Sequence, residues 1–71
     1  DYGLEVVFPE PWLSMIPVAK QEALFGILRQ DPRPSYQDDP ERVYGFNYLH
    51  FDVRFRVQDG VITVCEIEDL R

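Results

Sequence analysis

Residues 51–58 give the sharpest constraint on the fold of this chain. Apolar and polar side chains alternate without a break from Phe51 to Gln58. Strict alternation puts every second side chain on the same face of a β-strand, so the apolar set lines a core and the charged set faces solvent. The dipeptide Asp59-Gly60 follows directly and favours a tight turn into a second strand over residues 61–67. We therefore predict a sheet with one buried face.

The turn at Asp59-Gly60 leaves two registers open for this hairpin. A two-residue turn pairs Phe55 with Val64 and carries Glu66 to the core face. A three-residue turn with Gly60 as a bulge buries no carboxylate and instead turns inward Val61, Thr63, Cys65 and Ile67. Because an unpaired buried charge is costly, we predict the second register, in which Cys65 is a buried, unreactive thiol.

Two more segments are typical of strands. Residues 4–8 are rich in β-branched and aromatic side chains and end at Pro9, which cannot donate a ladder hydrogen bond. Residues 43–49 carry aromatic side chains at every second position: Tyr44, Phe46 and Tyr48. Beside Arg54 and Arg56 this aromatic stripe also fits a base-stacking surface, but in so small a chain we predict that it is core.

Two segments between these strands are typical of helices. Pro11 favours a short helix that includes Trp12 and Met15, and Pro17 is well placed to begin the next one. Residues 18–30 then repeat apolar side chains at helical spacing, on the face of Leu24, Ile27 and Leu28. Gly26 lowers the helix propensity of this segment, so we expect close packing against a neighbour there.

These segments predict an α+β fold for a single domain over residues 1–71, with the strand order left open. We expect a small antiparallel sheet, in which the N-terminal strand joins a C-terminal three-stranded meander, packed by one short and one longer helix. A domain of 71 residues has a small core. Because the chain begins at Asp1 and runs at once into a strand, we expect it to be a fragment of something longer.

Composition narrows the function. The net charge is −6 with one lysine, which argues against a freestanding nucleic-acid-binding domain. A lone cysteine excludes an internal disulfide, and the lone histidine, His50, has no visible set of metal ligands or catalytic partners. We therefore expect no metal and no self-contained catalysis. No apolar run reaches membrane-spanning length, so we expect no membrane partner. The single cysteine is compatible with a reducing compartment, so we expect a cytoplasmic location.

The segment from Asp31 to Tyr36 is stiff because Pro32 and Pro34 flank Arg33. Such a stiff segment either positions the arginine at a functional site or merely connects the helix to the sheet. The segment alone does not distinguish these two interpretations. Asp31 lies near the negative end of the helix dipole, so it needs compensation, and Arg33 is the nearest candidate.

Three ordered motifs carry a resemblance to a known family. They are Phe25 to Tyr36 with its Asp-Pro-Arg-Pro core, Arg42-Val43-Tyr44-Gly45, and Phe51-Asp52-Val53-Arg54-Phe55-Arg56-Val57. Over residues 24–67 the chain resembles the C-terminal domain of TrmO, the TsaA-like or YaeB-like tRNA methyltransferases. The resemblance implies a parent that transfers a methyl group from S-adenosylmethionine to threonylcarbamoyl-adenosine beside the tRNA anticodon, with catalysis in an N-terminal β-barrel domain.

The same resemblance implies where such a domain acts. It places residues His50, Phe51, Asp52 and Val53 near the cofactor, with a second copy of the chain as a candidate partner, although His50 departs from the acidic residue associated with that position. Taken together with the charge pattern, it predicts an edge that touches tRNA or the barrel domain, formed by Asp31, Arg33, Tyr36, Arg54 and Arg56. The alternative is a structural docking or protein-interaction domain that makes no contact with RNA.

Overall fold

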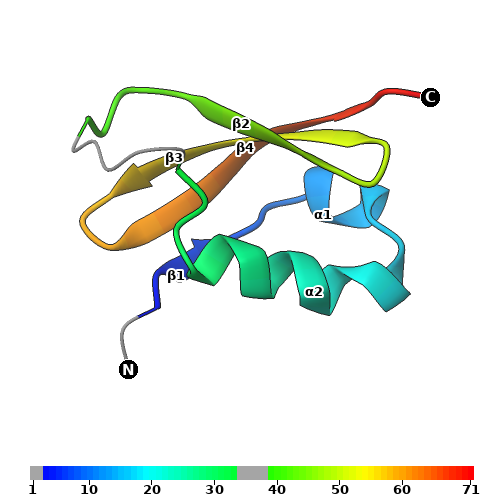
Figure 1. Ribbon diagram of the computed structural model, residues 1–71, viewed down its shortest axis with the longest axis horizontal. Coiled ribbons are helices and arrows are strands. Elements are labelled where there is room, and N and C mark those ends of the chain that lie inside the picture. The colour runs from blue at the N-terminus through cyan, green and yellow to red at the C-terminus, as the bar shows by residue number, and fades with distance from the viewer. Residues whose placement is uncertain (1–2, 34–38) are drawn as a thin grey trace.

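The computed structural model describes residues 3–33 and 39–71 and forms a four-stranded sheet with two helices (Figure 1). The strands are β1 (Glu5–Val7), β2 (Tyr44–Tyr48), β3 (Phe51–Gln58) and β4 (Val61–Asp69), in the spatial order β1-β4-β3-β2. The helices α1 (Trp12–Met15) and α2 (Val18–Arg29) lie between β1 and β2 in sequence. Among the described residues, no helix is long and apolar enough to span a bilayer.

The α+β fold and the C-terminal meander are confirmed. Strands β2, β3 and β4 pair antiparallel through two short turns. Strand β1 pairs with β4 in parallel, so the sheet is mixed rather than wholly antiparallel. The direction of β1 escapes prediction because both helices and two strands separate it from its partner, and no hairpin fixes it.

The β3–β4 hairpin corrects our predicted register. Asp59 and Gly60 both have positive φ, 53° and 77°, as in the two-residue type I′ turn. Phe55 consequently pairs with Val64, as in the register that we rejected. A register shift follows between Arg54 and Phe55, after which Arg54 pairs with Glu66. The chain thus has an extra residue in β4, a β-bulge that turns the carboxylate outward again.

The bulge also changes the environment of the cysteine. Cys65 is the extra residue, and it is half-buried instead of enclosed in the core as we predicted. Its thiol contacts the carbonyl oxygen of Thr63 at 3.6 Å. Val64 and Ile67 are the side chains that enter the core at this point, with exposures of 1% and 2%. The carboxylate of Glu66 stays out of the core, as we expected, but it does so because of the bulge and not because of the turn.

One face of the sheet packs against the helices. Leu24 and Leu28 of α2 are fully buried, as is Phe55 at the centre of β3. The Phe55 ring stacks on Tyr44 with centroids 5.5 Å apart and meets the edge of Phe46 at 5.9 Å, so the aromatic stripe is core, as predicted. Gly26 does not pack closely, because a Cβ there would meet nothing within 4 Å.

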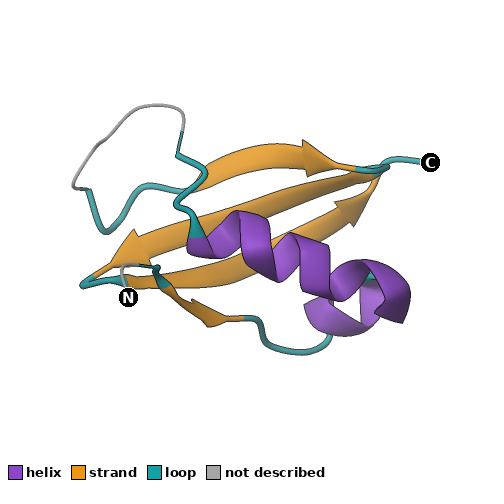
Figure 2. Ribbon diagram, turned by 60° about the horizontal axis from the view of Figure 1, so that its bottom comes forward, coloured by secondary structure: helices purple, strands orange, loops and turns teal. Residues whose placement is uncertain are grey.

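The opposite face of the sheet carries no element among the described residues. Figure 2 shows α1 and α2 on the same side of the strands. On the other side, the side chains of β3 and β4 alternate outward from the buried set, and Val7 of β1 is 40% exposed. We call this surface the open face.

The observed hairpin predicts a difference between two neighbouring substitutions. Val64→Ala removes two buried methyl groups and should lower the free energy of unfolding by about 2 kcal/mol. Cys65→Ser changes a half-buried position and should cost less than about 1 kcal/mol. Urea unfolding followed by circular dichroism measures both variants, and a larger loss for Cys65→Ser would favour the three-residue-turn register, in which Cys65 is buried.

Candidate functional site

The end of α2 holds the proline-flanked arginine in place. Asp31 follows the helix with a positive φ of 61°, a conformation that aspartate adopts more readily than most residues. Its carboxylate accepts two hydrogen bonds from Arg33, from Nε at 2.6 Å and from Nη2 at 2.5 Å. The Arg33 side chain is only 7% exposed. Arg33 therefore compensates Asp31, as the sequence predicts.

This contact sets the electrostatics of the pair. The hydrogen bond from Arg33 lowers the pKa of Asp31 and outweighs the opposing effect of partial burial. The Arg33 guanidinium also interacts electrostatically with the hydroxyl of Tyr44, which is buried and has no hydrogen-bond partner among the described residues. Since the Tyr44 ring belongs to the core, Arg33 lies on the helix side of the sheet.

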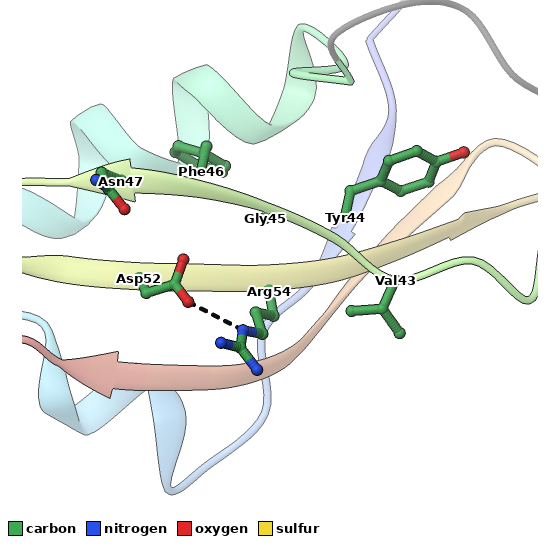
Figure 3. Close-up of a pocket in the computed structure, with 7 residues that line it drawn as sticks. All are labelled: Val43, Tyr44, Gly45, Phe46, Asn47, Asp52 and Arg54. Atoms are coloured by element: carbon green, nitrogen blue, oxygen red, sulfur yellow. Dashed lines mark hydrogen bonds and ion pairs between the residues drawn. The ribbon is translucent and has the colours of Figure 1, made fainter.

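Arg54 projects from the open face into a cluster of carboxylates. Its Nε donates to Asp52 at 2.9 Å, shown as a dashed line in Figure 3. Glu66 and Glu68 on β4 lie 3.7 Å from its other two nitrogens. The hydrogen bond to Asp52, with the charges of both glutamates, raises the pKa of Arg54. The positive charge of Arg54 is therefore outnumbered on this face.

A groove of about 630 Å³ runs beside Arg54 along the edge strand β2. Figure 3 shows its lining residues: Val43, Tyr44, Gly45, Phe46, Asn47, Asp52 and Arg54. Gly45 lies opposite Arg54 in the ladder, so there is no side chain to crowd the guanidinium from β2. This groove offers carboxylate and amide oxygens, with one cation that is already paired.

Arg56 differs from Arg54 although both project from β3. It is exposed, and among the described residues it has no ion-pair partner within 4 Å. It lies over a second groove of about 650 Å³. The lining of this groove comes from β3, β4 and the segments beside them: Pro40, Glu41, Arg56, Gln58, Asp59, Val61, Thr63 and Cys65. We call it the Arg56 groove.

The turn between β2 and β3 forms a third exposed feature. Leu49 and His50 make the turn, and Leu49 has a φ of 57° with 55% of its surface exposed. This region of backbone conformation favours glycine, so a leucine here is strained. The His50 ring packs against Phe51 at a tilt of 35° with centroids 4.1 Å apart, and it lies 3.7 Å from the carboxylate of Asp69. Leu70, also exposed, donates a backbone hydrogen bond to the carbonyl of His50. We call this end of the sheet the His50 turn.

The structure separates the residues that the sequence analysis grouped. Asp31 and Arg33 lie by Tyr44, on the helix side, whereas Arg54 and Arg56 lie on the open face. Tyr36 lies outside the described residues. Of the four residues expected near the cofactor, Phe51 and Val53 are buried in the core at 3% and 0% exposure. Of these four residues, only His50 and Asp52 have accessible side chains, because the side chains of Phe51 and Val53 pack into the core.

Sequence reasoning missed the strained Leu49 and the floor of the Arg56 groove. Leu49 ends the segment 43–49 that we predict as a strand, and its residue type does not signal a turn, since turns favour glycine, asparagine and aspartate. The floor of the groove depends on the bulge at Cys65, and no residue type in the sequence predicts a bulge there. Within the described ranges, no group of three or more histidine, cysteine or acidic side chains is arranged to hold a metal ion.

The Asp31–Arg33 contact predicts a pH dependence. Because folding lowers the pKa of Asp31, the contact stabilises the fold above the unfolded pKa of about 4 and loses that effect as the pH falls through the lower folded value. Asp31→Asn keeps the shape and tolerates the positive φ, so it should destabilise at pH 7 and cost progressively less toward pH 2. Urea midpoints across this range measure the difference; a constant gap would refute the linkage.

Comparisons with known proteins identify the family of this chain. The family model described as the TrmO C-terminal domain matches residues 4–70. A tRNA (adenine(37)-N6)-methyltransferase of Eikenella corrodens is 43% identical over 37 residues, which are 52% of this chain and 21% of that relative. The match thus spans about a fifth of the relative's length. No solved structure matches at a significant level. The chain belongs to the TrmO C-terminal domain family.

Proposed function

We propose that this chain is the non-catalytic accessory domain of a cytoplasmic methyltransferase that modifies tRNA, and that its His50 turn borders the cleft where cofactor and tRNA meet. In this proposal the methyl donor is S-adenosylmethionine, the target is the N6 position of threonylcarbamoyl-adenosine, and an N-terminal barrel domain performs the reaction. The family match over residues 4–70 carries the proposal. The activity for which the Eikenella corrodens relative is named, methylation of tRNA at adenine 37, agrees with it.

The residues expected near the cofactor do not form a cofactor pocket by themselves. Two of the four are core side chains, and the carboxylate of Asp52 is already bound to Arg54. A sulfonium-bearing nucleoside would need an apolar enclosure and free polar partners, which this turn lacks. We therefore assign the holding of the cofactor to the rest of the parent and give this domain a bordering role.

The His50 turn is the part of the chain best suited to that role. Leu49 and Leu70 expose apolar surface on either side of a histidine that is itself 27% exposed. A strained backbone conformation that keeps a leucine in solvent costs stability, and such outliers cluster at functional contacts. Contact with a neighbouring domain would bury both leucines and offset this cost.

Glycine at the turn provides the test. Leu49→Gly removes the exposed side chain and relieves the positive φ, so stability should stay within about 1 kcal/mol. If the turn borders the cleft, kcat/KM for tRNA methylation by the full-length protein should fall by about tenfold, equivalent to roughly 1.4 kcal/mol.

Val18→Ala is the control for this variant. It also removes an exposed apolar side chain, 83% exposed, but on α2 and on the helix side of the sheet. It should leave methylation unchanged. If Leu49→Gly and the wild-type protein have equal methylation activity, the His50 turn does not border the cleft.

A structural docking domain without RNA contact is the second candidate, and the charge arrangement on the open face favours it. Three carboxylates surround Arg54, and a tRNA phosphate would have to displace them. Phosphate contacts make affinity fall steeply with salt, by a slope that rises with each contact. The salt slopes of tRNA binding by the full-length protein and by a version lacking residues 1–71 separate the candidates. Equal slopes favour docking alone, and a steeper slope with the domain favours RNA contact.

A further inference from the structure

We infer that the Arg56 groove is the docking surface for the rest of the parent polypeptide, and that its occupant is a segment carrying an apolar side chain next to a carboxylate. This inference deepens the proposed function and rests on it for the existence of a longer parent. It concerns the open face and not the His50 turn, because the lining of the Arg56 groove does not include His50.

Three residues in one row across the sheet carry the argument. Val7 of β1 pairs with Thr63 of β4, and Thr63 pairs with Arg56 of β3. Directly paired residues point to the same face, so an exposed valine, a threonine and an exposed arginine lie side by side over three strands. Val61 and Cys65, both half-buried, extend the floor along β4. Within the groove lining, Val61 and Cys65 supply apolar surface and Arg56 the positive charge, with the carboxylates of Glu41 and Asp59 also in the lining, while Val7 continues the row beyond the groove.

The charge of Arg56 indicates a carboxylate in the occupant. Arg54, two residues away, has three carboxylates within 4 Å, whereas Arg56 has no ion-pair partner among the described residues. Glu41 and Asp59 line the same groove but do not come within ion-pair distance of Arg56. An arginine that lies over an apolar floor can pair with one carboxylate in bidentate geometry, which gives orientation as well as affinity.

The same charges disfavour two other occupants. A nucleic acid would bring a row of phosphates toward one guanidinium flanked by Glu41 and Asp59, on a chain of net charge −6. A second copy docking through the same face would bring two surfaces together on which carboxylates outnumber arginines: Glu5, Asp52, Glu66 and Glu68 against Arg54 and Arg56. A single carboxylate from elsewhere in the parent brings one negative charge instead of a row, and its bidentate pairing with Arg56 has to outweigh the repulsion of Glu41 and Asp59.

Cys65 supplies a direct readout, because it lies in the floor of the groove and is the single cysteine of this chain. The experiment uses the full-length protein and measures the alkylation rate of the Cys65 peptide by mass spectrometry. The first measurement adds neither cofactor nor tRNA, so its result stays informative if the His50 turn proves irrelevant to methylation, and a second measurement repeats it with tRNA and at lower protein concentration. We expect Arg56→Glu to accelerate alkylation by at least about tenfold over the wild type, because the groove opens.

The controls separate docking from unfolding. Arg71→Glu makes the same charge change at an exposed residue outside the groove and should leave the rate unchanged. Thr63→Arg places a large cation in the floor and should accelerate alkylation as Arg56→Glu does. Thermal unfolding of each variant by circular dichroism must match the wild type, and Thr63→Arg takes over as the test variant if Arg56→Glu does not fold.

Three results would overturn the inference. The first is equal alkylation of wild type and both groove variants, which would mean that the groove is uncovered. The second is protection that appears only when tRNA is added, which would assign the groove to nucleic acid. The third is protection that disappears on dilution with a fall in molecular mass, which would assign it to a second copy.

Discussion

The packing of α2 against the centre of the sheet is the interaction on which the rest of this structure depends. Leu24 and Leu28 meet a face of β3 and β4 on which Val53, Phe55 and Ile62 are fully buried. In a chain of 71 residues this single core uses most of the large apolar side chains. The opposite face of the sheet therefore receives polar and small side chains, and it is available for contacts outside the domain.

The sequence predicts the elements because each has a strong local signal. Alternation from Phe51 to Gln58 defines β3, and the prolines at positions 11 and 17 precede the two helices. The parallel pairing of β1 and the bulge at Cys65 were beyond prediction, because both depend on how distant segments meet in the core. Local pattern thus determines what forms a strand, while packing determines its partner and its register.

The candidate site was less predictable than the fold for a related reason. Arginine spacing shows which residues share a strand face, but not which carboxylates neutralise them. The sequence analysis grouped Arg33 and Arg54 at one edge, yet one is held by Asp31 on the helix side and the other by Asp52 on the open face. What distinguishes Arg56 is the lack of an ion-pair partner among the described residues, a property of the assembled sheet. This is why the structure favours domain contacts over a general affinity for RNA.

We propose that the open face and the His50 turn are both covered by the rest of a longer protein. Hydroxyl-radical footprinting with mass spectrometry tests it most directly, because it reports the exposure of individual side chains. In the full-length protein, oxidation of Val7, Leu49 and Leu70 should be several-fold slower than in the 71-residue chain, while Val18 on the helix side, 83% exposed, should be oxidised equally in both. Equal oxidation of all four, or protection of Val18 alone, would contradict the account.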